Sequence, residues 1–390
     1  MTRVVIVAAQ RTPFGRFRGQ LARVAPVELA TLATRAALKS LDPTAIDLLI
    51  LGNVLSAGHG MNLARQVAIR SGLPTATPAY TVNLMCGSGL QAALLGVQAI
   101  RAEEARAVVV GGVESMSQAA FAVPRPVKGQ LLDLNAAVDS LQQDGLIDSF
   151  SRRTMGQTVE DLAREYGITR VEQDTLAIRS HRLAQAAILE GRFRHELVPV
   201  GDVTSDESPR PDLSVEALGT LRTVFEEQGT LTAGNSSGVS DGAGMLVLAE
   251  ANYARQRGWQ ALAEWRHGLV TGCDPQRMGL GPVAAIRQLL DKTDLCLSDF
   301  DTLEINEAFA AQALACLRDL QVKVDDSPLC FNPDGGALAL GHPLAASGAR
   351  LLIHTAWRIA NGQSARTLLS LCIGGGMGIA SVITTPAAYP

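Results

Sequence analysis

Short runs of apolar and β-branched residues alternate along this chain with alanine-rich stretches that have the composition of helices. Strands that alternate with helices lie mostly in buried sheets, which accounts for the few polar residues in these runs. The alternation therefore predicts a layered α/β protein. The clearest strand-like runs are VVIVAA (4–9), LLILGN (48–53), AVVVGG (107–112), MLVLAE (245–250) and LLSLCIGGG (368–376).

A second pattern is that the same order of segments occurs twice. In the first half AIDLLILGNVLS (45–56) precedes a helix-like segment with a Ser-Gly pair, and in the second half FDTLEINEAFAA (300–311) precedes another. The order is the same in both copies, although the loop lengths differ, so we expect two related α/β halves packed together. The residues that align are Asp47 with Asp301 and Ser88-Gly89 with Ser347-Gly348.

Between the two copies, from about Ser117 to Ser240, the composition shifts toward proline, charged and polar residues. We interpret this stretch as an insertion on the first half that binds substrate, because long insertions often build binding surfaces. A solvated helical cap without function is the alternative. The predicted domains are an N-terminal half at 1–118 with 240–261, an inserted loop domain at 119–239 and a C-terminal half at 262–390.

Composition narrows the class of protein. The 390 residues are 47% hydrophobic and 18% charged, with a formal net charge of −4. No cluster of lysine and arginine stands out that would bind a nucleic acid backbone. No apolar run approaches the ~20 residues of a membrane span, and the N-terminus lacks the order of regions of a signal peptide. We therefore expect a cytoplasmic enzyme that binds neither nucleic acid nor a membrane.

Cys86 stands out among the six cysteines, which are scattered without the spacing of a disulfide framework or a metal site. It lies in NLMCGSG (83–89), where a strand-like run gives way to a helix start and glycines allow a tight turn. The N–H groups and positive dipole end of a helix start favour a thiolate and can hold an oxyanion. Cys86 is therefore either a nucleophile or, like most lone cysteines, a small buried filler.

Three further residues suit a cysteine nucleophile. His342 lies in the glycine-rich GGALALGHPLAASG (335–348), and histidine is the usual base because its pKa lies near neutrality, although a lone histidine is more often a satisfied core or surface group. Cys372 ends a buried strand and opens a triple glycine whose backbone can approach a ligand closely. Asn306 follows a strand, where it either caps the next helix or holds an oxyanion or a water.

Together these segments resemble the thiolase family over nearly the whole chain. Any one of them could occur by chance, but their order and spacing are highly specific. The matching stretches are RTPFGRFRG (11–19), NLMCGSG (83–89), GGVESMS (111–117), MGQTVEDLA (155–163), TAGNSSGVSDGAG (232–244), NEAFA (306–310), GGALALGHPLAASG (335–348) and CIGGGMG (372–378).

The resemblance implies two βαβαβαββ halves that form a layered α-β-α-β-α core, with the inserted loop domain over coenzyme A. It implies that Cys86 carries the acyl group and that His342 takes its proton. Cys372 would remove a proton from the second acetyl-CoA, or protonate the enolate that leaves during cleavage. Two oxyanion sites are implied, one formed by His342 with a water held by Asn306, the other by the backbone N–H groups of Cys86 and Gly374.

The resemblance also implies contacts with the acyl-CoA substrate. Coenzyme A is itself a substrate, so no cofactor is expected. Two of these positions have ordinary alternatives, since Arg210 lies in a polar loop and Phe225 could belong to the core. The implied substrate-binding residues are Met155, Arg210, Phe225, Ala233, Ser237, Met278 and Phe309.

The chain departs from the family pattern at three positions. Thr154 stands where many relatives have a histidine, which puts one contact with the pantetheine chain in doubt. Ala345 replaces a usual glycine after His342, and its Cβ could shift the histidine turn. Ser240 replaces a usual asparagine. None of the three is one of the implied catalytic residues.

The implied activity is that of an acetyl-CoA C-acetyltransferase, which interconverts two acetyl-CoA with acetoacetyl-CoA and coenzyme A. The segment between Phe121 and Arg152 resembles that of short-chain biosynthetic-type thiolases and favours this activity over a broader 3-ketoacyl-CoA thiolase of fatty acid β-oxidation. Condensing enzymes of fatty acid synthesis pair their cysteine with two histidines, and here the second position is Cys372. A non-catalytic thiolase-like lipid-binding protein is the alternative of another class. The family also implies a homodimer or homotetramer.

Overall fold

The apolar runs of the sequence form strands of one large sheet in the computed structural model, which describes residues 2–325 and 329–387. The first and last residues of the predicted halves, 1 and 388–390, lie outside the described residues. Within the described residues the sheet runs in the order β11-β10-β12-β13-β9-β1-β8-β5-β3-β4, with β2 on β8. Its strands are β1 (Val4–Arg11), β2 (Gly15–Arg16), β3 (Leu48–Gly52), β4 (Ala79–Val82), β5 (Ala107–Ser115), β8 (Ser240–Glu250), β9 (Ala263–Gly272), β10 (Thr302–Ile305), β11 (Cys330–Phe331), β12 (Arg366–Ile373) and β13 (Met377–Thr384).

The order of elements confirms the predicted repeat. Outward from the β1–β9 pair, the N-terminal strands run β1-β8-β5-β3-β4 and the C-terminal strands run β9-β13-β12-β10-β11, which is the same order of equivalent strands. With the helices between them, each half is a βαβαβαββ unit. The helices are α1 (Pro26–Ala37), α2 (Leu63–Arg70), α3 (Ser88–Arg101), α7 (Ala251–Gln256), α8 (Gly281–Thr293), α9 (Ala310–Asp319), α10 (Ala337–Leu340) and α11 (Leu344–Ala360).

The two aspartates that align in the sequence make the same contacts in the two halves. Asp47 precedes β3 and accepts hydrogen bonds from the N–H groups of Arg106 and Ala107, at the start of β5. Asp301 precedes β10 and accepts hydrogen bonds from the N–H groups of Ala365 and Arg366, at the start of β12. Each aspartate therefore ties together the starts of two neighbouring strands.

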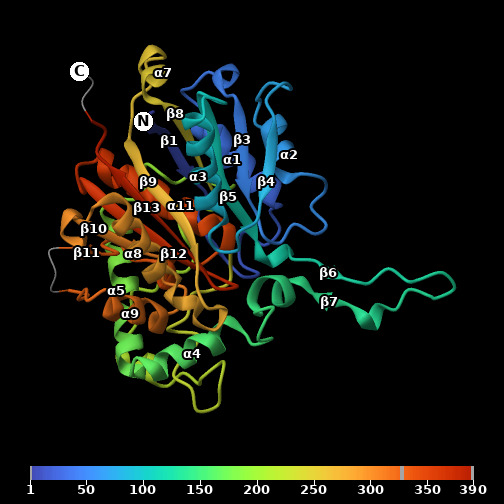
Figure 1. The fold of residues 1–390 in the computed structure, drawn as a ribbon. Helices are drawn as coiled ribbons and strands as arrows, with labels where there is room; N and C mark the ends of the chain where they lie inside the picture. Colours follow the sequence, from blue (N-terminus) through green and yellow to red (C-terminus); the bar gives the residue numbers. More distant parts are fainter. Residues whose placement is uncertain (1, 326–328, 388–390) are drawn as a thin grey trace.

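Five layers follow from the packing of the core (Figure 1). Helices α3 and α11 lie in the middle, between the two halves of the sheet, while α1 and α2 cover one outer face and α8 and α9 the other. The middle helices cross at glycines: a Cβ on Gly89 would lie 2.4 Å from the carbonyl oxygen of Ala345, and one on Gly348 would lie 2.8 Å from the backbone nitrogen of Leu90. This close crossing brings the two helix starts together.

The stretch between β5 and β8 holds α4 (Met155–Glu165), α5 (Arg170–Leu189) and α6 (Val215–Gly219). Capping boxes start α4 at Thr154 and α5 at Thr169. The sequence places this stretch on the first half, but α4 and α5 both pack against α9 of the second half, because their apolar residues belong to the same buried cluster as that helix. The inserted segment thus contacts the C-terminal half as well.

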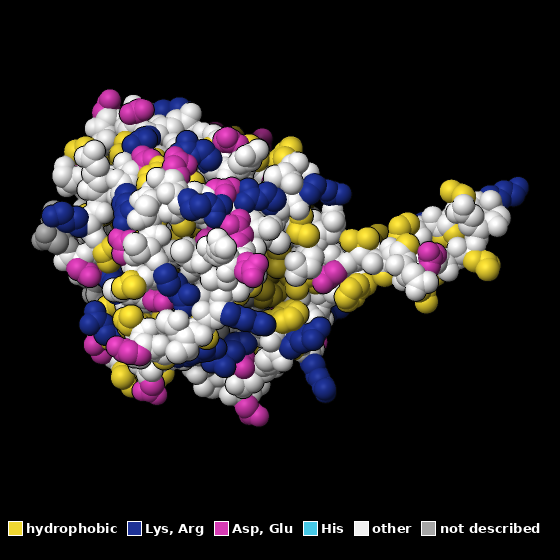
Figure 2. Space-filling model, turned by 90° about the horizontal axis from the view of Figure 1, so that it is seen from below, with side chains coloured by type: hydrophobic (Ala, Val, Ile, Leu, Met, Phe, Trp, Pro, Cys, Tyr) yellow, Lys and Arg dark blue, Asp and Glu magenta, His cyan; other side chains and the backbone are white. Residues whose placement is uncertain are grey.

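An arm leaves the body of the protein within the same stretch. We define it as residues 119–139; it contains β6 (Phe121–Ala122) and β7 (Val138–Asp139), which pair with each other. Figures 1 and 2 show it extending away from the rest of the molecule, and Figure 2 shows hydrophobic side chains along its length. Its exposed apolar residues include Phe121, Val127, Leu131, Leu132 and Leu134.

Helices of membrane-spanning length and hydropathy are absent from the described parts of the chain.

Candidate active site

Cys86 lies in the short turn between β4 and α3, as the sequence predicted. The turn is sharp because Met85, just before the cysteine, adopts a left-handed conformation with φ of 46°. Ser88, the first residue of α3, holds it in place: its hydroxyl donates to the carbonyl of Met85 at 2.6 Å and accepts from the N–H of Leu84 at 2.8 Å. The cysteine is thereby held at the helix start rather than within a strand.

His342 lies in a second turn, directly before α11. Gly341 has φ of 99°, and a Cβ there would lie 2.2 Å from Ser240 Oγ, so the turn requires glycine. The N–H of His342 donates to the carbonyl of Gly238 at 3.0 Å, and Ser240 Oγ donates to the same carbonyl at 2.7 Å. Ser240, which departs from the family pattern, therefore helps to hold the turn that presents the histidine.

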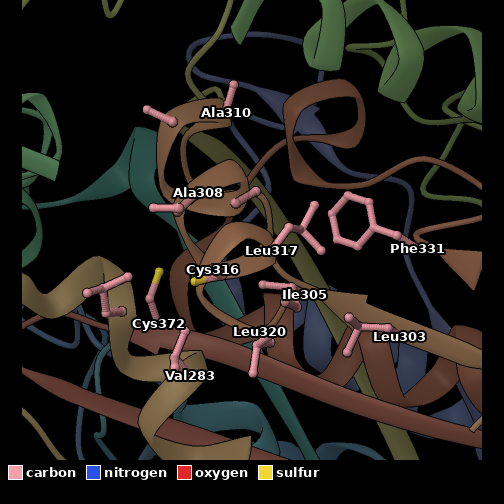
Figure 3. Packing of buried hydrophobic residues seen from close by; sticks show 14 of the residues in the cluster. Val283, Leu303, Ile305, Ala308, Ala310, Cys316, Leu317, Leu320, Phe331 and Cys372 are labelled. Atoms are coloured by element: carbon pink, nitrogen blue, oxygen red, sulfur yellow. The ribbon is translucent and has the colours of Figure 1, made fainter. Parts of the chain in front are cut away.

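Cys372 is the penultimate residue of β12, and the glycines that follow form the turn to β13. Its side chain lies in the buried cluster drawn in Figure 3, which also contains Cys316. Burial, followed by the neighbouring thiols Cys86 and Cys316, raises the pKa of Cys372 well above its usual range. Two residues further along the chain is Gly374, whose backbone N–H lowers the pKa of the Cys86 thiol, as does the N–H of Cys86 itself.

A single cavity of about 380 Å³ joins these turns. Four of the predicted catalytic residues line it, namely Cys86, His342, Cys372 and Gly374. Five of the predicted substrate-binding residues also line it, namely Met155, Phe225, Ser237, Met278 and Phe309. Figure 2 shows a hollow with hydrophobic side chains on its floor and lysine or arginine side chains along its border.

Three of the predicted residues do not line the cavity. Asn306 is buried behind His342, with its Nδ2 3.4 Å from the histidine Nδ1. Arg210 is exposed on the surface, where its backbone N–H donates to His181 Nδ1 at 3.1 Å. Ala233 is exposed as well. The structure therefore gathers the predicted catalytic residues, but not every predicted contact for the substrate.

Part of the cavity wall was not predicted from the sequence. Gln142, Gly145 and Leu146 line it from a short helical turn at the base of the arm (Leu141–Leu146). Neither a hydrophobic periodicity nor a motif in that segment predicts that its residues line the cavity. The only indication in the sequence is that the segment lies just before the inserted helices. Thr154 also lines the cavity, but its hydroxyl accepts a hydrogen bond from the N–H of Gln157 at 3.3 Å and caps α4.

Desolvation determines the charge states of the nucleophile, which is half-buried at the cavity wall, and of the histidine, which is buried. Desolvation raises the pKa of Cys86 to about 11, although the N–H groups of Gly374 and Cys86 act in the opposite direction. Desolvation, followed by the charge of Arg350, lowers the pKa of His342 to about 4. The N–H groups at the helix start favour the thiolate, as expected from the sequence, but the loss of water outweighs them in the resting protein. At neutral pH the pair is a thiol and a neutral imidazole.

Glu114 ties together the loops around the two turns. Its carboxylate is buried and accepts hydrogen bonds from the N–H groups of Val54 at 3.1 Å, Leu55 at 3.0 Å and Ala345 at 3.2 Å. Burial raises the pKa of Glu114 to about 7. The methyl group of Ala345, another departure from the family pattern, is buried in a small cluster with Val54 and Leu55, so the fold accommodates it.

Over the described residues, no group of three or more His, Cys, Asp or Glu side chains has the arrangement of a metal site.

Comparison with known proteins identifies the family. The thiolase N-terminal domain matches residues 4–252 and the thiolase C-terminal domain matches residues 259–385. An acetyl-CoA acetyltransferase of Pseudomonas aeruginosa is 44% identical over 391 residues, which cover 97% of this chain and 98% of that protein. A probable acetyl-CoA acyltransferase of Staphylococcus aureus is 44% identical over 395 residues, covering 98% and 99%.

A solved structure agrees with these matches. The human mitochondrial 3-ketoacyl-CoA thiolase in complex with CoA superposes with a TM-score of 0.93 at 40% identity, covering 99% of this chain and 98% of that one. The duplicated fold, the cysteine at the helix start and the matches over both halves lead to one conclusion. The chain belongs to the thiolase family of enzymes.

Proposed function

We propose that the protein is an acetyl-CoA C-acetyltransferase, which interconverts two acetyl-CoA with acetoacetyl-CoA and coenzyme A through an acetyl group on Cys86. The observation that carries the proposal is the single apolar cavity in which Cys86, His342 and Cys372 meet. The acetyl-CoA acetyltransferase of P. aeruginosa supports the choice of acyl group. The human thiolase, which was solved with CoA, supports coenzyme A as the carrier.

The first half of the reaction acylates Cys86. The thiol gives its proton to His342 Nε2 as the sulfur attacks the thioester carbon of acetyl-CoA, so that no free thiolate is needed beforehand. Negative charge develops on the carbonyl oxygen, which would accept hydrogen bonds from the N–H groups of Cys86 and Gly374, the same groups that lower the pKa of the thiol. The C–S bond to coenzyme A then breaks, and the leaving sulfur takes the proton of Cys372.

The second half forms the carbon–carbon bond. The thiolate left on Cys372 removes a proton from the α-carbon of a second acetyl-CoA, and the enolate oxygen accepts a hydrogen bond from protonated His342 Nε2. The enolate carbon attacks the acetyl group, and acetoacetyl-CoA forms as the bond to Cys86 breaks. The sulfur of Cys86 recovers its proton from His342, and all three groups return to their starting states.

Chain length distinguishes this activity from its nearest alternative, a broader 3-ketoacyl-CoA thiolase activity, and the human relative is a 3-ketoacyl-CoA thiolase. Met155, Met278 and Leu146 line the cavity, and we expect these bulky side chains to disfavour a long acyl chain. We predict that thiolysis of acetoacetyl-CoA exceeds that of 3-ketohexadecanoyl-CoA in kcat/KM by about tenfold or more. Equal or faster turnover of the long substrate would assign the protein to the degradative class, and no thiolysis of either substrate would favour a non-catalytic lipid-binding protein.

Assembly into a homodimer or homotetramer is part of the same proposal. Two features of the described structure support it: the arm carries exposed apolar side chains, and β4 ends the sheet with β3 as its only neighbour there. An unpaired strand edge is a common site of association between subunits. The cytoplasmic location expected from the sequence stays a prediction.

A further inference from the structure

The two ring nitrogens of His342 have different surroundings. Nδ1 lies 2.5 Å from the hydroxyl oxygen of Ser347, near the start of α11. Nε2 is buried and has no hydrogen-bond partner within the described residues, and its ring lines the cavity together with Cys86. Because a neutral imidazole carries one proton, the partner of Nδ1 determines whether Nε2 can act as a base.

Ser347 has no other evident reason to be a serine. Its side chain is buried, and within the described chain His342 is the only hydrogen-bond partner of its hydroxyl. The residue lies inside a helix, where alanine has the higher intrinsic propensity and would occupy nearly the same volume. The hydroxyl is therefore accounted for by its contact with the histidine rather than by the fold.

We propose that Ser347 is a positioning residue that accepts a hydrogen bond from Nδ1–H of His342 and keeps the lone pair of Nε2 available to Cys86. The inference rests on the proposed function, because it assigns His342 as the base for the Cys86 thiol. Nε2 takes the thiol proton during acylation and returns it when Cys86 is released, while Nδ1 keeps its own proton throughout. If Ser347 instead donated to Nδ1, the proton would lie on Nε2 and the thiol would have no base.

The environment of Asn306 is compatible with the same proton position. Its Oδ1 is buried without a partner, while its Nδ2 lies 3.4 Å from His342 Nδ1. A rotation of the amide by 180° exchanges the two atoms without changing the space they fill. After that rotation Oδ1 faces Nδ1–H as a second, longer acceptor beside Ser347, while Nδ2 takes the buried place that has no partner. Either orientation of the amide leaves one of its two polar atoms without a partner, so Asn306 accommodates a protonated Nδ1 at no extra cost.

A neutral hydroxyl beside His342 is also more compatible than a carboxylate with an uncharged Cys86 and an uncharged His342. A carboxylate at this position would stabilise the protonated ring and raise the pKa of His342 toward neutrality. The Ser347 hydroxyl orients the ring without adding charge, in keeping with a pKa of about 4 for His342. The ring therefore stays neutral until the thiol of Cys86 delivers its proton.

The first test observes the tautomer directly. The full-length protein is labelled with 15N-histidine, and the signals of His342 are assigned by their loss in the His342→Gln variant. We expect the resting protein to show a protonated Nδ1 and an unprotonated Nε2, and Ser347→Ala to show a mixture of the two tautomers. A protonated Nε2 in the wild-type protein, or an unchanged spectrum in Ser347→Ala, would overturn the proposal.

The second test asks whether Ser347 acts through His342. Alkylation of Cys86 by iodoacetamide is followed by mass spectrometry in the wild type, in Ser347→Ala, in His342→Ala and in the double variant. We expect Ser347→Ala to slow alkylation and thiolysis kcat about tenfold, with KM changed less than about twofold, and to have no further effect when His342 is absent. Equal effects in both backgrounds would mean that Ser347 is merely structural.

A matched control removes another buried hydroxyl from a helix far from the cavity. Thr34 in α1 is buried and donates to the carbonyl of Ala30 at 2.7 Å, so Thr34→Val deletes a similar hydrogen bond. We expect this variant to alkylate and turn over at the wild-type rate, and a loss as large as that of Ser347→Ala would contradict the assignment. Neither the tautomer nor the alkylation rate requires acetyl-CoA, so an error in the proposed substrate would leave both results unaffected.

Discussion

The resting Cys86–His342 pair differs from the thiolate–imidazolium pairs of many cysteine enzymes. Such pairs need water or fixed charges to stabilise two opposite charges. Here the cavity is largely apolar, and the charge that shifts the pKa of His342 is the cation of Arg350, which disfavours a protonated ring. We therefore expect Cys86 and His342 to stay uncharged until a thioester is bound and an oxyanion can form. The nucleophile is activated by the reaction rather than before it.

Alkylation of Cys86 should reveal this neutral state. Because the thiolate is the reactive form and the pKa of Cys86 is about 11, we expect its reaction with iodoacetamide to accelerate continuously as the pH rises from about 6 to about 10. Mass spectrometry of the Cys86 peptide measures the rate, and the Cys86→Ala variant identifies that peptide. A rate that levels off near neutral pH would indicate a stable thiolate and contradict the assigned pKa.

The two cysteines should fail at different steps. Cys86→Ala has no atom to hold the acyl group, so incubation with radiolabelled acetyl-CoA should leave the protein unlabelled. Cys372→Ala retains the nucleophile, His342 and the N–H groups, so it should still become acetylated, more slowly, while condensation falls by roughly 10²-fold or more, as for a lost general base. Labelling of Cys86→Ala at Cys372 would reverse the two roles, and normal condensation by Cys372→Ala would exclude it from the mechanism.

At the scale of elements, α3 and α11 position the site. Helix α3 begins two residues after Cys86, and α11 begins two residues after His342. Their crossing at Gly89 and Gly348 fixes the distance between the two turns. The repeat made these helices predictable from sequence, because both carry a Ser-Gly pair after a strand. The equivalent serines, Ser88 and Ser347, have taken different tasks: one holds the nucleophile turn and the other contacts the histidine.

Other parts of the site could not be predicted from sequence, for physical reasons. Leu146 lines the cavity because the chain folds back at the base of the arm. This is a tertiary contact, and no hydrophobic periodicity in the local sequence predicts it. The charge state of Cys86 depends on the removal of water by distant segments, whereas the sequence shows only the helix start beside it. Arg210 matches a family position, yet its side chain lies on the surface away from the cavity lining.

The proposed role of the arm in assembly can be tested by mutation. Leu131 is 94% exposed and Leu132 is 55% exposed, which is unfavourable for leucines unless another subunit covers them. We predict that Leu131→Glu with Leu132→Glu lowers the molar mass in solution to that of a smaller assembly, as measured by light scattering after gel filtration. Val171→Glu, on the exposed surface of α5, adds charge elsewhere and should leave the mass unchanged. An unchanged mass in the arm variant would exclude the arm from assembly.

At the scale of the whole molecule, a buried ionic network joins the three parts of the chain. Arg11, at the end of β1, bonds to Glu196 at 2.6 Å and to Asp206 at 2.6 Å, both in the inserted segment. Glu196 also contacts His354 of α11 at 3.1 Å, and the other nitrogen of that histidine contacts Asp334 at 2.9 Å. Removal of one member would leave a buried charge unpaired, which is far costlier than the loss of a surface ion pair.

This network should make stability depend on pH. Burial alone would lower the pKa of His354, but the charges and hydrogen bonds of Glu196 and Asp334 outweigh it and raise the pKa to about 9. A raised histidine pKa stabilises the fold fully below the unfolded value of 6.5, and that stability is lost as the pH rises through about 9. We predict that urea unfolding shows a deficit for His354→Gln on the order of 3 kcal/mol near pH 6, from about 1.4 kcal/mol per tenfold change in proton affinity.

The deficit should shrink steadily between about pH 6.5 and about pH 10, because the wild-type histidine loses its charge over that range. A deficit of constant size across the range would show that the substitution acts through packing and not through the charge of His354.

The protonated state of the half-buried Cys86 has one more consequence, which concerns oxidative damage. Oxidation of a cysteine begins from its thiolate, so a sulfur that stays protonated offers hydrogen peroxide little to attack. Cys296 and Cys330, by contrast, are exposed on the surface. Oxidants in the surrounding solution therefore meet these two thiols before they reach the one that carries the acyl group, and the protein can accumulate oxidised surface cysteines while its acyl-carrying sulfur remains intact.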